Sequence, residues 1–221
     1  MAESPLEVLP PELRRVRSIA VHASAVGRRV DQILLDRSYH HKWMGRLKDA
    51  DRRGRPDIVH FSLLEATSTP LYAKEELSVY VHTCRDTMIE VGKKVRLPKT
   101  YARFEGLMVN LFRDRRVPET GEALLKLIEN GFSGLVSSLR PSLTIGLSTQ
   151  GERSSFEEVA SSFARQEKPV LVVGGFPRGH FSPHVRGVMD EIYSVCGMSL
   201  EAHVVVARTL YEYEKAVGVT C

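Results

Sequence analysis

The chain has 221 residues, of which 43% are hydrophobic and 26% are charged. Because domains commonly hold about 150 residues, this length favours one large domain over two of full size. No apolar run approaches the about 20 residues that a membrane-spanning helix requires, and the acidic, proline-rich residues 1–11 lack the pattern of a secretion signal. The composition therefore argues against secretion and membrane residence, and it favours the cytoplasm.

Basic residues are concentrated in two stretches of the chain. The 31 lysines and arginines outnumber the 27 aspartates and glutamates, which gives a formal net charge of +4. The excess lies in residues 45–55 and again between residues 93 and 116. This distribution is typical of a surface that binds nucleic acid, and it also fits a solvated basic face without a ligand.

Neither the cysteines nor the histidines have the spacing of a metal site. Cys84, Cys196 and Cys221 are far apart and form no disulfide framework, which suits a reducing cytosol. The eight histidines contain no ligand pair of a zinc type. We therefore expect a protein without a metal.

The first half of the chain alternates between short β-like runs and helical stretches, which is typical of an α/β domain. We expect a strand over residues 17–25, a helix over 30–35, and a helix that begins at Pro56, where the missing N–H costs nothing, and ends at Pro70. Residues 77–83 and 87–91 predict a hairpin, and a helix follows from near Pro98 to about Arg113. Residues 124–128 fit either a strand or a helix.

The second half predicts a strand over residues 143–147, a helix over 154–166, a buried parallel strand over 169–173, a strand over 191–195 and a closing helix over 200–217. Together these elements indicate a mostly parallel sheet, which binds ligands at the carboxyl ends of its strands. We divide the chain into an N-terminal tail, residues 1–16, and a single domain, residues 17–221.

The helix predicted near residues 98–113 has one apolar face and one cationic face. Lys99, Arg103 and Arg113 share the cationic face with Gly106, where another group can approach closely. Arg55 and Arg96 would add to this charge if the fold brings them near. Arginine is well suited to phosphate, although the same pattern fits an ordinary amphipathic surface helix.

Three glycine-containing turns follow or end predicted strands, at residues 146, 174–179 and 195–200. Bare main chain at such turns can offer the donor and the acceptor that an adenine edge needs. The sequence has no dinucleotide-binding fingerprint and no phosphate-loop lysine. Each turn by itself also fits a plain connection.

Two longer motifs carry a family resemblance: residues 55–60 (RPDIVH) and residues 96–111 (RLPKTYARFEGLMVNL). They resemble the small-subunit ribosomal RNA pseudouridine N1-methyltransferases of ribosome biogenesis, a family of the SPOUT superfamily, in its archaeal type. The resemblance covers about residues 17–217. It implies an α/β fold with a SPOUT-type mostly parallel sheet and a C-terminal trefoil knot, a homodimer, and S-adenosyl-L-methionine as cofactor.

The resemblance also implies roles for individual residues. Arg55 and Asp57 would be catalytic: a cation such as Arg55 or Arg103 would lower the pKa of the target base, and Asp57 would either accept a proton or anchor an arginine. The cofactor would be bound, chiefly through the backbone, by Leu147, Gly174, Gly179, Val195, Cys196, Gly197, Met198, Ser199 and Leu200. Small-subunit ribosomal RNA would be bound by Arg55, Asp57, Arg96, Lys99 and Arg103.

Two other functions stay open at this point. The protein could be an assembly factor that binds ribosomal RNA without catalysis, with ribosomal proteins of the small subunit as further partners. It could also be a SPOUT methyltransferase that acts on transfer RNA. A methyl-transfer assay on different RNA substrates separates these functions.

Overall fold

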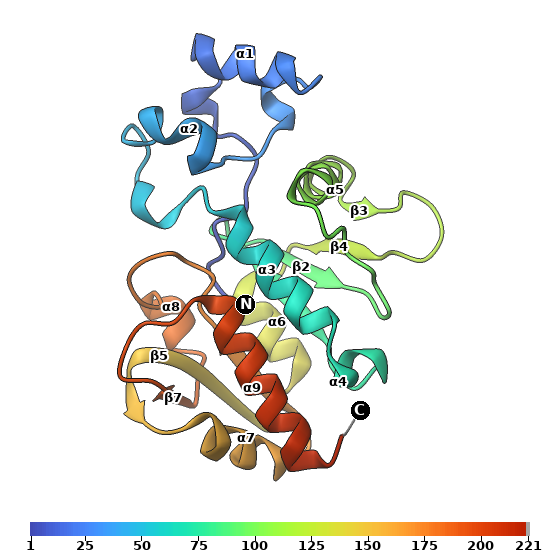
Figure 1. Cartoon of the computed structure of the whole chain (residues 1–221), viewed down its shortest axis with the longest axis vertical. Coiled ribbons are helices and arrows are strands. Elements are labelled where there is room, and N and C mark those ends of the chain that lie inside the picture. The colour runs from blue at the N-terminus through green and yellow to red at the C-terminus, as the bar shows by residue number, and fades with distance from the viewer. Residues whose placement is uncertain (220–221) are drawn as a thin grey trace.

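The computed structural model describes residues 1–219, which form two sheets and the helices around them (Figure 1). Cys221 lies outside the described residues. The strands are β1 (Val79–His82), β2 (Met88–Val91), β3 (Arg116–Val117), β4 (Leu125–Ile128), β5 (Leu143–Arg153), β6 (Pro169–Val173) and β7 (Glu191–Ser194). The α-helices are α1 (Arg17–Ala25), α2 (Arg37–Met44), α3 (Pro56–Thr67), α4 (Pro70–Ala73), α5 (Tyr101–Asp114), α6 (Gly131–Leu139), α7 (Phe156–Ala164), α8 (Pro183–Arg186) and α9 (Ala202–Val217).

The α/β class is confirmed, but the prediction of a mostly parallel sheet is only partly right. β6, β5 and β7 form a parallel sheet in that order, whereas β1, β2, β4 and β3 form a separate antiparallel sheet. The reason lies in the connections. A short turn joins β1 to β2 and therefore makes them antiparallel, because parallel neighbours need a crossover of a dozen or more residues.

The strand predicted over residues 17–25 is wrong, because this segment is helix α1. Ile19 and Ala23 are its buried residues, which is the spacing of one helix face, while Val21, which would share their face in a strand, is 62% exposed. The helix predicted over 30–35 is also mostly wrong. Only Val30–Gln32 form a short 3-10 turn, and the next three apolar residues are extended and fully buried.

The other predicted elements are confirmed, with shifted ends. α3 begins at Pro56 and the hairpin of β1 and β2 forms as expected, while α5 begins at Tyr101, three residues after Pro98. The ambiguous residues near 124–128 form β4. In the second half, β5 continues to Arg153, well past the predicted end, through a shift in its pairing with β7.

The predicted tail, residues 1–16, is packed into the fold: its first residues lie between the two sheets, and its later residues pack against α1 and α2. Ala2 pairs with Gly174 after β6, and Ser4 pairs with Thr83 after β1. The Ala2 N–H donates to the Val173 carbonyl at 2.9 Å, and the Ser4 N–H donates to the His82 carbonyl at 2.8 Å. Ala2, Leu6, Leu9 and Leu13 are fully buried. This segment therefore connects the parallel sheet to the antiparallel one.

A small helical lobe, formed by α1, α2 and the segments that join them, stands apart from the sheets at the top of Figure 1. It has a core of its own that includes Leu9, Leu13, Ile19, Ile33 and Met44. Buried Asp36 caps α2 by accepting the Ser38 N–H at 2.7 Å, and it also accepts the Tyr101 hydroxyl at the start of α5. The lobe and α5 therefore have a fixed relative position.

None of the helices within residues 1–219 is long and apolar enough to span a bilayer.

α3 and α9 pack side by side across the front of the molecule and cover the region where the two sheets meet (Figure 1). The N-terminus of α3 thereby comes next to the carboxyl ends of the parallel strands.

A buried histidine in the lobe predicts a loss of stability in mild acid. Burial, followed by the charge of neighbouring His22, lowers the pKa of His40 from 6.5 to about 4. The Asp36 N–H donates to His40 Nδ1 at 3.0 Å, so a proton on Nδ1 would face a donor. Between pH 6.5 and 4 the unfolded chain binds a proton that the folded protein does not. The free energy of unfolding therefore decreases as the pH is lowered through that window.

We expect His40→Leu to flatten the pH dependence of the urea midpoint between pH 6.5 and 4, because the differential proton binding is removed. Exposed His41 provides the matched control as His41→Leu. Urea unfolding measured at several pH values in this window checks the prediction. Equal pH dependence in the wild type and His40→Leu would contradict it.

Candidate functional site

A cleft of about 390 Å³ lies at the carboxyl ends of the three parallel strands. Of the nine positions predicted to bind a cofactor, eight line it and Gly197 does not. The eight are Leu147, Gly174, Gly179, Val195, Cys196, Met198, Ser199 and Leu200. Three segments spread over some 50 residues of sequence therefore line one cavity.

Strand register explains why these segments meet. Leu147 of β5 is paired with Val173 of β6 and with Tyr193 of β7. The turns that follow β6 and β7 therefore begin at the same level, as expected for parallel strands whose carboxyl ends share one edge. The cleft forms where these two turns and the residues after Leu147 come together.

The glycines of these turns do not all serve the cleft. A Cβ at Gly146 would lie 2.2 Å from Met189 Sδ, so this glycine, which lies within β5, is required by the packing of Met189 against the sheet and does not line the cleft. A Cβ at Gly197 would have no heavy atom within 4 Å. Gly174 does line the cleft, and its Cβ would come within 2.8 Å of the Phe176 ring.

Several polar residues that line the cleft were not predicted, because glycine-rich turns indicate bare main chain and give no signal for the side chains within and beside them. Arg178 and His180 belong to the turn after β6, and Glu201 directly follows the turn after β7. The other missed polar residues are Ser148, Thr149 and Ser194. Both signs of charge are therefore present around the cavity, with Arg55 and Arg178 as cations and Glu201 as the carboxylate among its lining residues.

Arg55 and Asp57 form a tight ion pair at the N-terminus of α3. Arg55 Nε donates to the two carboxylate oxygens at 2.8 and 3.1 Å, and Nη2 donates to Oδ2 at 2.8 Å. The hydrogen bonds to Asp57, with a smaller contribution from the charge of Glu201, raise the pKa of Arg55. Arg55 lines the cleft and Asp57 does not, so Asp57 holds the guanidinium at the cavity edge.

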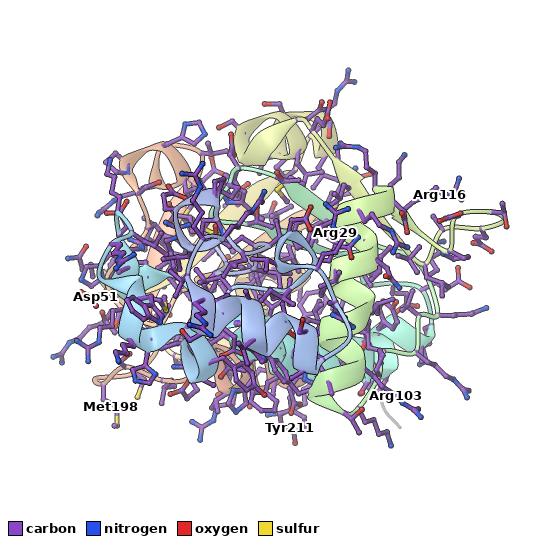
Figure 2. All side chains as sticks on the ribbon, turned by 90° about the horizontal axis from the view of Figure 1, so that it is seen from above. Arg29, Asp51, Arg103, Arg116, Met198 and Tyr211 are labelled. Atoms are coloured by element: carbon purple, nitrogen blue, oxygen red, sulfur yellow. The ribbon has the colours of Figure 1, made fainter. Side chains whose placement is uncertain are left out.

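Arg96 and Lys99 precede α5 and Arg103 lies in its first turn, and all three are outside the cleft. All three side chains are exposed, and within residues 1–219 none of them forms an ion pair. Figure 2 shows Arg103 on the same side of the molecule as Met198 of the turn after β7 and Tyr211 of α9. Arg103 is therefore available to a ligand that covers this side.

His60 explains how the two sequence motifs are connected in space. This buried residue of α3 donates from Nε2 to the Pro98 carbonyl at 2.8 Å, and its ring stacks on Phe104 of α5 with centroids 4.4 Å apart. The segment that carries Lys99 is thereby fixed against the helix that follows Arg55. The close approach predicted at Gly106 is made by Arg28 of the lobe, whose Nη2 lies 2.9 Å from the position of a Cβ.

Within residues 1–219, no three histidine, cysteine, aspartate or glutamate side chains are grouped so that they could hold a metal ion. The charged groups of the site are the arginines, the lysine and the carboxylates described above. The arrangement combines a cavity with both charge signs, an anchored guanidinium at its edge, and exposed cations beyond that edge.

Known proteins resemble the chain over its whole length. The ribosomal RNA small subunit methyltransferase Nep1 of Thermococcus kodakarensis is 35% identical over 218 residues, which are 99% of this chain and 97% of that protein. The protein of the same name from Pyrobaculum calidifontis is 37% identical over 219 residues and covers the same shares. The crystal structure of Archaeoglobus fulgidus Nep1 bound to S-adenosylhomocysteine superposes with a TM-score of 0.86 at 33% identity, covering 98% of this chain and 96% of that one.

A sequence model described as EMG1/NEP1 methyltransferase matches residues 1–214. The match includes both motifs that carry the resemblance and all of the residues that line the cleft. The chain belongs to the EMG1/NEP1 methyltransferase family.

Proposed function

We propose that this protein is an S-adenosylmethionine-dependent methyltransferase of small-subunit ribosomal RNA in ribosome biogenesis, and that it methylates N1 of a pseudouridine. The observation that carries the proposal is the cleft at the carboxyl ends of β5, β6 and β7 with Arg55 at its edge. Family membership, the names of the relatives and the S-adenosylhomocysteine bound to the similar structure support it.

The residues of the cleft fit the proposed cofactor. Its volume of about 390 Å³ lies within the range of about 300–1,000 Å³ that is usual for small-molecule sites. Glu201 complements the cationic groups of the cofactor, Arg178 complements its carboxylate, and the main chain at Gly174 and the turn after β7 is open to an adenine edge. When bound, S-adenosylmethionine supplies a methyl group that its sulfonium makes electrophilic.

The protein's part in the reaction is positioning and electrostatic stabilisation. N1 of pseudouridine carries a weakly acidic proton, and negative charge develops on the ring when that proton is lost. We propose that the Arg55 guanidinium stabilises this charge from the cleft edge, and that Asp57 holds the guanidinium in place. The target base must be unstacked to reach the cleft, which suits a loop of ribosomal RNA.

We propose that Arg96, Lys99 and Arg103 hold RNA phosphates. Lys99→Ala is then expected to reduce the steepness of the dependence of log Kd on log salt by about 0.7, the value for one phosphate contact on a single strand. Exposed Arg165 at the end of α7 provides the control as Arg165→Ala, which should leave the slope unchanged. Equal slopes for Lys99→Ala and the wild type would contradict a phosphate contact at Lys99.

We further propose that two copies pair through the face formed by α3 and α9. Phe61 and Tyr211 on this face are 49% and 60% exposed, and Phe61 packs against His203 with ring centroids 5.7 Å apart. A second copy would cover these rings and add its own cations to the RNA surface. Sedimentation of Tyr211→Glu beside the wild type tests this pairing, because a buried carboxylate would weaken it.

Three finer points remain part of the proposal. We propose a trefoil knot in the C-terminal elements, on the basis of the family and of the full-length likeness to the Nep1 structure. We propose that residues 17–221 act as one domain, and that the protein works in the cytoplasm, where it meets ribosomal RNA and ribosomal proteins of the small subunit. A solved structure and a pull-down of assembling small subunits test these points.

The function is tested by methyl transfer to a pseudouridine-containing hairpin of small-subunit ribosomal RNA and to its uridine twin. We expect the pseudouridine hairpin alone to gain the mass of one methyl group. Binding of both RNA and cofactor without transfer would favour a non-catalytic assembly factor. Preferred methylation of transfer RNA would favour the other SPOUT function.

A further inference from the structure

The loop between β6 and α8 forms one wall of the cleft, yet it has little backbone support. Phe176, Pro177, Arg178, Gly179 and His180 of this loop all line the cavity. Within residues 1–219, no backbone N–H of residues 176–181 donates to another backbone carbonyl. The shape of this wall must therefore depend on side chains that contact the loop from behind.

Arg52, at the end of the 3-10 turn Ala50–Arg52, makes that contact. Its Nη1 donates to the His180 carbonyl at 2.7 Å, and its guanidinium carbon lies 4.2 Å from the centroid of the Phe176 ring. The same Nη1 lies 3.5 Å from the position of a Cβ at Gly179. Arg52 does not line the cleft itself, so it acts on the cavity only through the loop.

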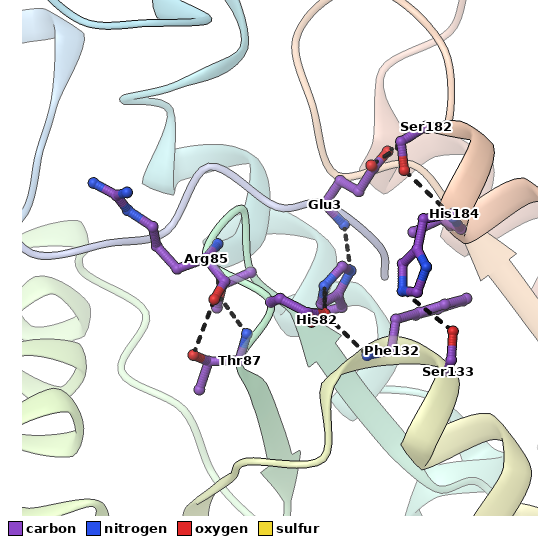
Figure 3. Close-up of polar contacts among 11 residues, drawn as sticks. Glu3, His82, Arg85, Thr87, Phe132, Ser133, Ser182 and His184 are labelled. Atoms are coloured by element: carbon purple, nitrogen blue, oxygen red, sulfur yellow. Dashed lines mark hydrogen bonds and ion pairs between the residues drawn. The ribbon is translucent and has the colours of Figure 1, made fainter.

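Glu3 fixes both Arg52 and the end of the loop. Its Oε2 accepts from Arg52 Nη2 at 3.0 Å, and its carboxylate accepts the Ser182 N–H at 3.1 and 3.3 Å. Figure 3 shows Glu3 reaching Ser182, with the Glu3 backbone N–H directed at His82, whose Nδ1 accepts it at 3.2 Å. Glu3 has a φ of 54°, a conformation that costs free energy for a residue with a Cβ and persists only where its surroundings fix it.

The segment that holds Arg52 also carries Arg55. Between them, Arg53 is buried and pairs with Glu7 through two bonds of 2.7 and 2.8 Å. Arg52 thus faces the loop, Arg53 faces the core, and Arg55 faces the cleft edge. One anchored segment determines both the position of the loop and the position of the proposed RNA-side guanidinium.

We propose that Arg52, held by Glu3, is a positioning residue that sets the cofactor-side wall of the cleft and its alignment with Arg55. The inference rests on the proposed function, since it assigns Arg52 a role at the same cavity. This role requires an arginine at position 52. Nη1 and Nη2 donate to two different acceptors while the flat face of the group packs on Phe176, which a planar guanidinium allows and a lysine ammonium does not.

The test uses the full chain, with S-adenosylhomocysteine as the calorimetric probe and methyl transfer as the kinetic readout. For Arg52→Gln we expect the Kd for S-adenosylhomocysteine and the KM for S-adenosylmethionine to rise about tenfold, because hydrogen bonds from a charged donor that shape the wall are lost. At saturating cofactor, kcat should change much less, and so should RNA affinity. Arg52→Lys should not restore cofactor affinity.

Arg14→Gln is the matched control, because Arg14 donates to a backbone carbonyl of the same lobe, that of Leu9 at 3.0 Å, without contacting the loop. Its cofactor affinity should equal that of the wild type. Glu3→Gln is the second variant, and it decides the matter if Arg52→Gln does not fold. We expect Glu3→Gln by itself to weaken cofactor binding in the same direction, and where Arg52→Gln folds, the two effects should not be additive.

Two results would overturn the inference while leaving the proposed function intact: a wild type that methylates RNA with Arg52→Gln binding S-adenosylhomocysteine as tightly, or full rescue by Arg52→Lys. A wild type that does not bind S-adenosylhomocysteine would overturn both the inference and the proposed function. If Arg14→Gln loses as much kcat and cofactor affinity as Arg52→Gln, the inference about Arg52 is also overturned, since the effect would then be general to the lobe.

Discussion

Arg55→Ala is expected to lower the rate of methyl transfer to a pseudouridine hairpin by about two to three orders of magnitude. The Arg55 guanidinium faces the cleft edge, where it would meet negative charge that exists only as the base loses its proton. Because an interaction made only in the transition state changes the rate more than ground-state binding, the affinity for S-adenosylhomocysteine should fall much less. Single-turnover transfer and calorimetry on the same samples check both expectations.

Asp57→Asn separates the two roles that the sequence leaves open for this carboxylate. Asp57 makes three close contacts with Arg55, so we expect the variant to lose about tenfold in rate, the effect of weakening one charge-assisted contact. The shape of the pH–rate profile should stay that of the wild type. A loss of about three orders of magnitude at every pH would instead identify Asp57 as the base.

An Arg55→Ala protein with wild-type rate would contradict the electrostatic mechanism as a whole.

Glu7→Ala is expected to lower the free energy of unfolding by about 3–5 kcal/mol, because it leaves a buried guanidinium without its partner. The Glu7 and Arg53 side chains are 4% and 10% exposed, and Glu7 also accepts from Arg85 at 3.0 Å. Urea unfolding measures the loss. Exposed Glu12 of the same N-terminal segment is the control, and Glu12→Ala should change stability by less than about 1 kcal/mol.

A double variant tests the stated cause of that loss. Replacing the pair together, as Glu7→Leu with Arg53→Met, removes the unpaired charge and should recover much of the stability lost in Glu7→Ala. Arg85 is half exposed and can turn to water when its partner is removed. A Glu7→Ala protein as stable as the wild type would show that the pair contributes little.

Several features could be predicted from the sequence because they depend only on residues close together in the chain. Pro56 marks a helix start because a first-turn residue needs no N–H partner, and residues 169–173 indicate a buried strand because they are apolar without alternation. The family resemblance left two roles for Asp57, to accept a proton or to anchor an arginine, and in the structure this carboxylate forms an ion pair with Arg55. The glycine turns after β6 and β7 were visible as possible ligand contacts for the same reason: their main chain is bare.

Other features depend on contacts between residues far apart in the chain. Residues 17–25 contain a pattern that fits a strand, and only packing within the lobe shows that Ile19 and Ala23 form one buried helix face. Residues 1–11 are acidic and rich in proline, and their backbone partners lie far along the chain, in β1, at the end of β6 and in residues 33–35.

The same division applies to the site. The glycines made the turns after β6 and β7 recognisable as possible ligand contacts, and the family resemblance named the eight positions that line the cleft. Arg52 lies 128 residues before the carbonyl that it supports, and Glu3 lies 179 residues before Ser182. Such pairs have no periodicity or spacing in the chain, because their distance is set by strand order and by the packing of the lobe, and only the folded protein determines it.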